Sequence, residues 1–316
     1  MTAYPKKRIL LDCDPGTDDA LAIILALKTA SLHLDSITTV NGNVSAEQCT
    51  LNALRILAFM CRGDIPVIKG ADAPLIVDRV HSAYVFGQDG LGNCSSGLHC
   101  TGQPVATDAV SHILTQIKQG EIDTIVATGP LTNIANAYKE DKTLMNSLKE
   151  IIVMGGAIHT SGNITAFAEF NFYCDPHAAD YVLQNAANLT LIPLDVTTKA
   201  RFYKKDISGI SDLSLKHFIE TTSSPWFAFS RSVKQKGISL HDPLALGYAI
   251  TREFIKTEKT WLNIHLSGEK RGWCEIAAEE KGYPVLYGKE VNATGFKAFF
   301  KRSINFSDNP PDPRGA

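Results

Sequence analysis

Short apolar runs alternate along this sequence with longer segments in which apolar residues recur at helical spacing. The apolar run at 9–11 precedes an alanine- and leucine-rich segment at 20–30, and the run at 34–40 precedes a periodic segment at 46–60. A short apolar run bounded by turn residues is typical of a buried strand, and a longer periodic segment is typical of a helix. The chain therefore begins with two strand–helix pairs.

The same alternation continues to the end of the chain. Further strands are predicted at 66–68, 122–127, 151–154, 189–194, 261–266 and 284–287, and further helices at 105–118, from 176 onward, within 205–236, at 241–250 and at 294–301. The repeated order predicts one α/β domain at 1–304, with a mostly parallel central sheet covered by helices on both faces. The segment 70–102 is predicted as a long loop, and the proline-rich segment 305–316 as a mobile tail.

Four carboxylates lie close together at the first strand-to-helix junction. Asp12 and Asp14 are two residues apart on an extended segment, so we expect their side chains to point the same way. The proline and glycine that follow turn the chain, which brings Asp18 and Asp19 back towards them. The carboxyl end of a strand in a parallel sheet is the usual edge for a ligand.

Carboxylates packed in this way repel one another unless a cation or hydrogen-bond donors compensate their charge. Oxygen ligands alone favour Ca²⁺ or Mg²⁺ over zinc. The alternative is that the acids only cap the helix, because Thr17 can cap and Asp18 and Asp19 suit the helix dipole. Capping does not account for Asp12 and Asp14, and we therefore predict a site for a hard divalent cation.

Other polar groups also follow predicted strands. Asn43 follows the second strand, Thr128 follows the strand at 122–127, and the stretch from Asn163 to Asn171 follows the strand at 151–154. Because the carboxyl ends of parallel strands meet at one edge of a sheet, we expect these residues to gather around the acids.

Composition narrows the classes of partner. The net charge is -2, and Lys and Arg are spread along the chain, so no basic face for nucleic acid and no cationic membrane patch is expected. The sequence has no apolar stretch long enough to cross a bilayer and no signal-peptide core, and its seven cysteines form no C-x-x-C pair. We expect a cytoplasmic protein with reduced thiols that acts on a small molecule.

Five segments resemble, in the same order, motifs of the inosine-uridine-preferring nucleoside hydrolases, which are metal-dependent enzymes. These are the segments DCDPGTDDA at 12–20, TGPLTN at 128–133, MGG at 154–156, EFN at 169–171 and HDPLA at 241–245. The resemblance extends from about Arg8 to Arg302. It implies a Rossmann-like nucleoside hydrolase fold and hydrolysis of the N-glycosidic bond of ribonucleosides to ribose and free base.

The resemblance also implies roles for individual residues. A tightly held Ca²⁺ would be bound by Asp14, Asp19, the main-chain carbonyl of Thr128 and Asp242, with ribose hydroxyls and a water as further ligands. The side chains implied to bind ribose are those of Asp18, Asn43, Asn163, Glu169 and Asn171, and Met154 and Phe170 are implied to contact the sugar. The family is often dimeric or tetrameric, which implies a homodimer or homotetramer.

The chemistry of these residue types agrees with that activity. Bond cleavage builds oxocarbenium character on the ribose, and carboxylates and amide oxygens stabilise positive charge. Asp14 is predicted to be the general base for a water whose pKa the cation lowers. His241 is predicted to protonate the leaving base, because the ordinary pKa of histidine is near ~6.5.

The preferred base stays open. Members of the family that accept pyrimidines often carry His-Gly before a Gly-Leu segment, whereas this chain has Phe86-Gly87 there, and His81 does not align. Phe86 resembles the purine-preferring branch and is predicted to stack on the base, while His241 resembles the branch of broader specificity. The aromatic residues Trp226, Phe227 and Phe229 can belong to the core or contact the base.

Two other functions remain open from the residues. A phosphohydrolase of the haloacid-dehalogenase type also begins with D-x-D, but it expects Thr or Val where this chain has Gly16 and leaves His241 and Asp242 without a role. A non-catalytic ribose or nucleoside receptor would leave a metal-bound acid without a purpose.

Overall fold

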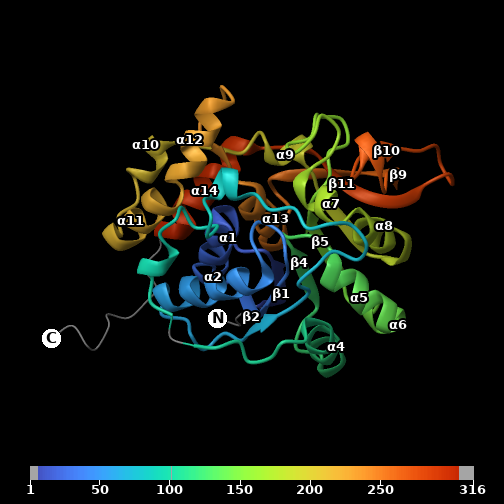
Figure 1. Ribbon diagram of the computed structural model, residues 1–316, viewed down its shortest axis with the longest axis horizontal. Coiled ribbons are helices and arrows are strands. Elements are labelled where there is room, and N and C mark those ends of the chain that lie inside the picture. The colour runs from blue at the N-terminus through green and yellow to red at the C-terminus, as the bar shows by residue number, and fades with distance from the viewer. Residues whose placement is uncertain (1–5, 101, 306–316) are drawn as a thin grey trace.

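The computed structural model describes residues 6–100 and 102–305, and the predicted tail lies outside them except for its first residue. Figure 1 shows helices and loops packed around one central sheet. No helix within the described residues is long and apolar enough to span a bilayer.

The sheet has nine strands in the order β10-β9-β11-β6-β5-β4-β1-β2-β3. The strands from β3 to β11 in this order run parallel to their neighbours, and only the pairs β11–β9 and β9–β10 are antiparallel. The strands are β1 (Lys7–Cys13), β2 (Leu32–Thr39), β3 (Val67–Lys69), β4 (Thr124–Ala127), β5 (Glu150–Met154), β6 (Leu189–Ile192), β9 (Ile255–Ile264), β10 (Cys274–Ile276) and β11 (Tyr283–Val291). The predicted mostly parallel sheet is confirmed.

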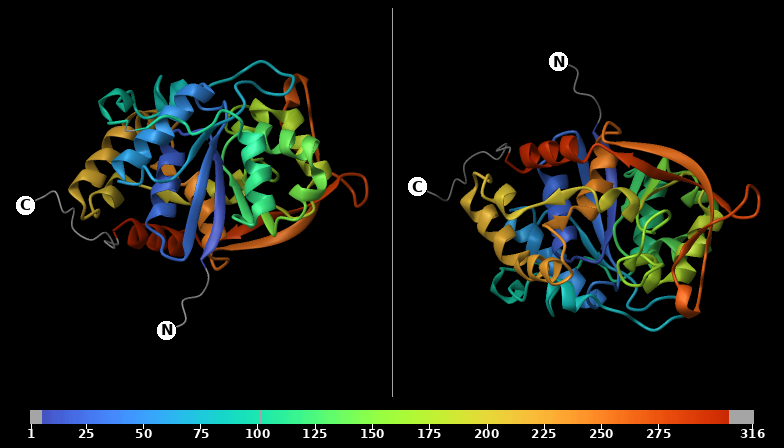
Figure 2. Two further views of the ribbon diagram at one scale, coloured as in Figure 1. Left: turned by 90° about the horizontal axis from the view of Figure 1, so that it is seen from below. Right: turned by 90° about the horizontal axis from the view of Figure 1, so that it is seen from above.

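Helices cover both faces of the sheet, as Figure 2 shows from two sides. One core cluster packs β1 side chains such as Ile9 and Leu11 against α1, α2, α13 and α14, while Leu10 belongs to a second cluster that contains α4, α5, α6 and α8. This alternation follows from the two-residue period of a strand, and it explains why these runs are apolar at every position. The helices named here are α1 (Thr17–Leu27), α2 (Ala46–Phe59), α4 (Ala109–Gln119), α5 (Thr132–Glu140), α6 (Lys142–Met145), α8 (Pro176–Asn185), α13 (His241–Ile250) and α14 (Ala293–Asn305).

The sheet order places a topological switch point between β1 and β4. From β1 the chain proceeds outward through β2 and β3 on one side, and then returns to β4, β5 and β6 on the other. Loops that leave neighbouring strands in opposite directions open a crevice at the carboxyl ends of those strands. The acidic segment after β1 lies at this crevice.

Several boundaries differ from the sequence prediction. Helix α4 begins at Ala109 and not at 105, because the side chain of Asp108 caps it by accepting a hydrogen bond from the Ser111 amide. The expected long loop at 70–102 contains the short helices α3 (Ala83–Phe86) and η1 (Ser95–Gly97). The predicted helical region at 205–236 divides into α10 (Lys204–Ile207), α11 (Leu213–Thr222) and α12 (Ser224–Ser232).

The short elements were not predicted. They are α7 (Phe170–Cys174), α9 (Leu194–Thr197), the two-residue strands β7 (Arg201–Phe202) and β8 (Ile238–Ser239), β10, and the turn η2 (Gly268–Lys270). Segments of two to five residues carry too little periodicity to be recognised from sequence.

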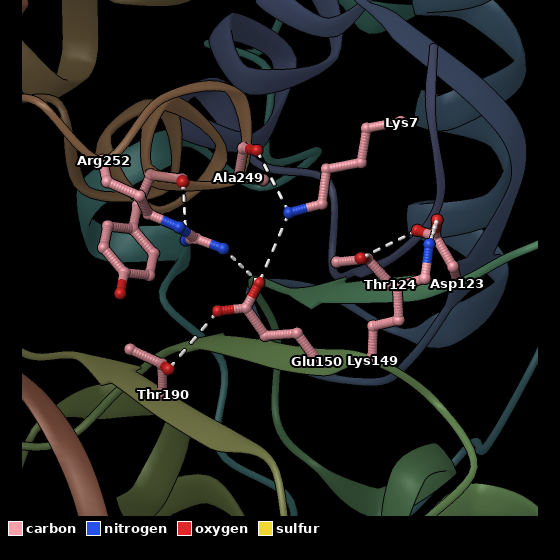
Figure 3. A network of polar contacts seen from close by, with 9 residues as sticks. Lys7, Asp123, Thr124, Lys149, Glu150, Thr190, Ala249 and Arg252 are labelled. Atoms are coloured by element: carbon pink, nitrogen blue, oxygen red, sulfur yellow. Dashed lines mark hydrogen bonds and ion pairs between the residues drawn. The ribbon is translucent and has the colours of Figure 1, made fainter. Parts of the chain in front are cut away.

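An ion-pair network at the opposite end of the strands ties the sheet to α13. Glu150 on β5 pairs with Lys7 at 3.3 Å and with Arg252, and Lys7 also donates to the carbonyl of Ala249 at 3.2 Å (Figure 3). The Glu150 side chain is only 16% exposed. We therefore expect the contribution of this network to the free energy of unfolding to lie between that of an exposed ion pair and that of a buried one.

We predict that Glu150→Gln lowers the free energy of unfolding by about 1–2 kcal/mol, because Lys7 and Arg252 then face each other without a carboxylate. Urea denaturation monitored by circular dichroism measures the change. Glu220→Gln is the matched control, since Glu220 is exposed on α11. Equal stability of the two variants would contradict a stabilising role of the network.

Candidate active site

The acids after β1 are held by the beginning of helix α1. Gly16 is the N-cap, and its amide donates to the Asp19 carboxylate at 2.9 Å. Asp18 and Asp19 occupy the first turn, where the helix dipole favours negative charge. Capping therefore contributes to this arrangement, but it involves only one oxygen of Asp19.

Asp14 lies in a tight polar niche between the loops after β1, β2 and β4. Its Oδ2 accepts a hydrogen bond from the Asn43 amide at 2.6 Å, whereas its buried Oδ1 has no hydrogen-bond partner. A Cβ added to Gly42 would lie 2.0 Å from Asp14 Oδ2, and one added to Gly129 would lie 2.9 Å from Oδ1. Both positions therefore require glycine, because a side chain there would collide with the Asp14 carboxylate. Asp14 Oδ1 remains available to bind a cation or to accept a proton.

Asp19 is fixed from three directions. Its Oδ1 accepts from the hydroxyl of Thr128 at 2.8 Å, and its Oδ2 accepts from the Asn43 side chain at 3.3 Å in addition to Gly16. The carbonyl of Thr128 itself accepts from the side chain of Asn171 at 2.7 Å. The loops after β1, β2 and β4 therefore meet at Asp19, as predicted from the order of the strands.

Asp242, on the first turn of α13, completes an acidic cluster with Asp18 and Asp19. One carboxylate oxygen from each of these three side chains lies within 4.8 Å of the others. Asp18 Oδ1 is a second buried oxygen without a hydrogen-bond partner.

Burial and mutual repulsion raise the pKa of these acids. Burial is the larger cause at Asp14, Asp18 and Asp242, whose pKa values lie well above the ordinary range, with repulsion from neighbouring aspartates as the next cause. Burial raises the pKa of Asp19 to about 6. A divalent cation would remove this repulsion, and the buried oxygens without partners at Asp14 and Asp18 are ligands of the kind that hard cations take.

Asp12 does not join the acidic cluster, which corrects our expectation that it points with Asp14. Its Oδ1 accepts from the Thr38 hydroxyl at 2.5 Å and from the Asn133 side chain at 2.7 Å, and burial raises its pKa to about 7. The strand ends at Cys13, so Asp14 no longer follows the pleat on which Asp12 lies. The carboxylates that do group together are those of Asp18, Asp19 and Asp242.

Asn133, the last residue of the segment at 128–133, lies in the first turn of α5. Its Nδ2 also donates to the carbonyl of Thr39, and its Oδ1 accepts from the amide of Ala71 at 2.9 Å. Asn133 therefore connects the ends of β1 and β2 with the segment after β3 by hydrogen bonds, and it does not line the cavity.

A cavity of about 490 Å³ opens beside the acidic cluster. All eight residues predicted to contact the substrate line it: Asp18, Asn43, Phe86, Met154, Asn163, Glu169, Phe170 and Asn171. Thr128, His241 and Asp242 line it as well, whereas Asp14 and Asp19 are fully buried behind it. The volume is in the range of small-molecule sites.

The loop before α7 supplies a rigid polar wall. Glu169 caps α7, since its carboxylate accepts from the amides of Asn171 at 2.8 Å and Phe172 at 3.1 Å, and it also accepts from Gly156 at 3.1 Å. Burial raises the pKa of Glu169 to about 6. Asn163 accepts from the amide of Phe170 at 2.9 Å. These polar side chains are held in place by backbone contacts before any ligand binds.

His241 lies among aromatic rings that line the cavity. Its Nδ1 is 2.8 Å from the Thr197 hydroxyl, and its ring stacks near Trp226, which packs edge-on against Phe86. Burial, with a smaller contribution from Arg201, lowers the pKa of His241 to about 3. The expectation of an ordinary pKa near neutrality is therefore wrong, and the imidazole is neutral at pH 7.

Some cavity residues were not predicted. They are Ser82, Tyr84, Thr160, Ser161, Gly162, Leu194, Thr198, Arg201, Ser230, Val233, Gln235, Ile238 and Ser239, with Val85 beside Phe86. Trp226 and Phe229, for which core and base-contacting positions were both open, line the cavity, whereas Phe227 is buried in the core. Most of the unpredicted residues come from irregular segments and very short elements, which have no recognisable sequence pattern. The aromatic-rich stretch 224–232 is the one signal in the sequence that could have indicated some of them.

A mostly parallel α/β sheet with an oxygen-rich acidic cluster at its switch point and a polar cavity beside it is the arrangement of an α/β protein that binds a small molecule together with a hard cation. The chain belongs to the inosine-uridine preferring nucleoside hydrolase family, whose family model matches residues 9–298.

Relatives in this family support an enzymatic function. The chain is 36% identical over 297 residues to the pyrimidine-specific ribonucleoside hydrolase RihA of Shewanella woodyi, covering 90% of this chain and 91% of that protein. It is 34% identical to the protein of the same name from Escherichia coli O7:K1, covering 90% of this chain and 92% of that protein. This protein is therefore an enzyme that hydrolyses ribonucleosides to ribose and base, and the comparisons give no support to a phosphohydrolase or a receptor.

Solved structures agree with this assignment. A plant nucleoside hydrolase, PpNRh1, matches with a TM-score of 0.89 at 30% identity and covers 95% of this chain and 99% of that one. The purine-preferring ribonucleoside hydrolase from Gardnerella vaginalis matches with a TM-score of 0.86 at 28% identity and covers 95% and 98% of the two chains. The relatives thus include both pyrimidine-specific and purine-preferring proteins.

We predict that Gly42→Ala lowers kcat/KM for ribonucleosides by about 100-fold, because the new methyl group would displace the carboxylate of Asp14. Steady-state assays of base release measure the loss. Gly97→Ala is the control, since a Cβ at Gly97 meets no atom within 4 Å. A Gly42→Ala enzyme with the activity of the control would show that the position of Asp14 is not critical.

Proposed function

We propose that the acidic cluster binds one Ca²⁺ and that Asp14 activates the water that attacks the ribonucleoside. The observation that carries this proposal is the pair of buried oxygens without partners, Asp14 Oδ1 and Asp18 Oδ1, beside the grouped carboxylates of Asp18, Asp19 and Asp242. An all-oxygen set of this charge suits a hard cation of flexible geometry.

The protein ligands proposed for the ion are Asp14, Asp19, Asp242 and the main-chain carbonyl of Thr128. Asp18 belongs to the same cluster, but its side chain reaches the cavity surface, whereas Asp19 is fully buried. This difference supports Asp18 as a ribose-binding residue. When bound, the ion would hold ribose hydroxyls and lower the pKa of a water molecule.

The proposed ribose subsite uses the polar wall of the cavity. Asn43, Asn163 and Asn171 offer amide groups, and Glu169 offers a buried carboxylate beside them. Met154 and Phe170 add apolar contacts with the sugar. Because carboxylates and amide oxygens face the ring, positive charge that develops on the ribose in the transition state is stabilised there.

Asp14 is the proposed general base. Its Oδ1 has no competing hydrogen bond, and its Oδ2 is fixed by the Asn43 amide, so the carboxylate is held in one orientation with one oxygen available for a proton. Glycines on both sides exclude larger groups from the same space.

His241 is the proposed residue that assists the departure of the base. With Nδ1 at the Thr197 hydroxyl, the remaining ring nitrogen is available to a base in the cavity. Because the free imidazole is neutral at pH 7, its contribution is a hydrogen bond from Nε2–H to the leaving base, and not proton transfer from a standing imidazolium.

Phe86 is the proposed stacking partner of the base. It lines the cavity with Trp226, and the two rings meet edge-on with centroids 5.1 Å apart. Stacking serves purines and pyrimidines alike, so Phe86 alone does not select between them. A homodimeric or homotetrameric assembly and a cytoplasmic location stay predictions from sequence.

The test of the proposed function is base release from inosine, guanosine, adenosine, uridine and cytidine, measured with and without EGTA. Millimolar Mg²⁺ is present throughout, so that EGTA removes Ca²⁺ and leaves Mg²⁺ available. We expect release from at least one nucleoside, loss of activity in EGTA, and recovery on addition of excess Ca²⁺. Full activity in EGTA and in EDTA would contradict the cation, and restoration by Mg²⁺ alone would contradict the choice of Ca²⁺.

We predict that Asp14→Asn lowers kcat by at least about 1,000-fold, because a base and a metal ligand are lost together. The closest control is Asp72→Asn, an exposed acid in the loop after β3. Activity of the Asp14 variant within tenfold of the wild type, with the cation present, would rule out the assigned role.

We predict that His241→Ala slows natural nucleosides by about 100-fold or more, and p-nitrophenyl riboside by less than about threefold, because nitrophenolate leaves without help from a hydrogen-bond donor. Equal losses on both substrates would mean that His241 positions the sugar and does not act on the base.

A further inference from the structure

The cavity is lined by acidic side chains and by one cationic side chain. The acidic lining residues Asp18, Glu169 and Asp242 come from α1, the start of α7 and α13. Among the described residues that line the cavity, Arg201 is the only Lys or Arg, and it comes from β7. The strand partner of Arg201 is Ser239, which lies two residues before His241, the residue proposed to contact the base. Arg201 is therefore placed near the proposed base position.

Arg201 is held in place by neutral acceptors only. Its Nε donates to the carbonyl of Lys236 at 3.1 Å, one Nη donates to Ser239 Oγ at 2.5 Å, and the other donates to Gln235 Oε1 at 3.2 Å. The β7–β8 ladder pairs Arg201 directly with Ser239. Within the described residues no carboxylate pairs with Arg201, although the side chain is partly buried.

A guanidinium held by these three contacts still has N–H donors available for a ligand. Arginine has five N–H donors in a planar fork, and the three contacts above use three of them. Its positive charge is not neutralised by a neighbouring acid. Such a group binds strongly to an oxygen that carries partial or developing negative charge.

Cleavage of the N-glycosidic bond leaves the bonding electron pair on the base. In a base with a carbonyl at purine position 6 or pyrimidine position 4, part of this negative charge is delocalised onto that oxygen. An amino group at the same position presents N–H donors instead, and it would leave the arginine donors unpaired.

We propose that Arg201 is a specificity-determining residue that donates to the O6 or O4 carbonyl of a keto nucleobase and stabilises its charge as it departs. The inference rests on the proposed function of the cavity as a ribonucleoside site. It predicts a preference for inosine, guanosine and uridine over adenosine and cytidine, which cuts across the division between purines and pyrimidines.

The test compares kcat/KM of the wild type and Arg201→Gln on two matched pairs of substrates, inosine with adenosine and uridine with cytidine. We expect the variant to lose about 10- to 100-fold on the keto member of each pair, and less than about threefold on the amino member. Hydrolysis of p-nitrophenyl riboside by the variant, within about threefold of the wild type, shows that the ribose end is intact.

Arg231→Gln is the matched control, because Arg231 is exposed on the neighbouring α12 and does not line the cavity. Equal losses on keto bases, amino bases and p-nitrophenyl riboside would overturn the proposal, since Arg201 would then only hold the β7–β8 pair. Unchanged kcat/KM on all substrates would overturn it too. Failure of the wild type on every nucleoside would instead contradict the proposed function itself.

Discussion

The architecture of the site depends on the electrostatic cost of burying several aspartates together. Asp14, Asp18, Asp19 and Asp242 are almost completely removed from water, and burial raises their pKa values. Repulsion from neighbouring aspartates raises those of Asp14, Asp18 and Asp242 further. Backbone amides, the Thr128 hydroxyl and the N-terminus of α1 compensate only part of the charge. The proposed divalent cation would compensate the remaining charge, and it would also activate the water that the reaction needs.

This constraint explains why the site lies where it does. Loops from four parallel strands and the start of α13 reach one point only at the topological switch between β1 and β4. The cavity at this point is lined by carboxylates, which suit a sugar that becomes positive, and by aromatic rings and Arg201, which suit a base that becomes negative. The cavity thus matches the charge separation of the bond that breaks.

The sequence predicted those parts that are local or strongly periodic. The strands and long helices could be recognised from apolar runs, and Asp14 and Asp19 from a contiguous motif between a strand and a helix. The position of Asp242 could be inferred only by resemblance, because nothing local connects it with residues more than 200 positions earlier.

The remaining differences have physical reasons. Asp12 was misplaced because the strand ends at Cys13 and breaks the two-residue alternation. The pKa of His241 depends on burial by distant rings such as Trp226, which no local pattern reports. Arg201 was missed because two-residue strands leave no periodic signal, although they place it in the cavity.

The most direct test of the central claim is elemental analysis of the protein after dialysis against Ca²⁺, with Asp19→Asn treated in parallel. The account predicts a single tightly held Ca²⁺ per chain in the wild type and none in the folded variant, whose circular dichroism spectrum is unchanged. A fully active wild type without bound metal, or equal metal content in the two proteins, would contradict it.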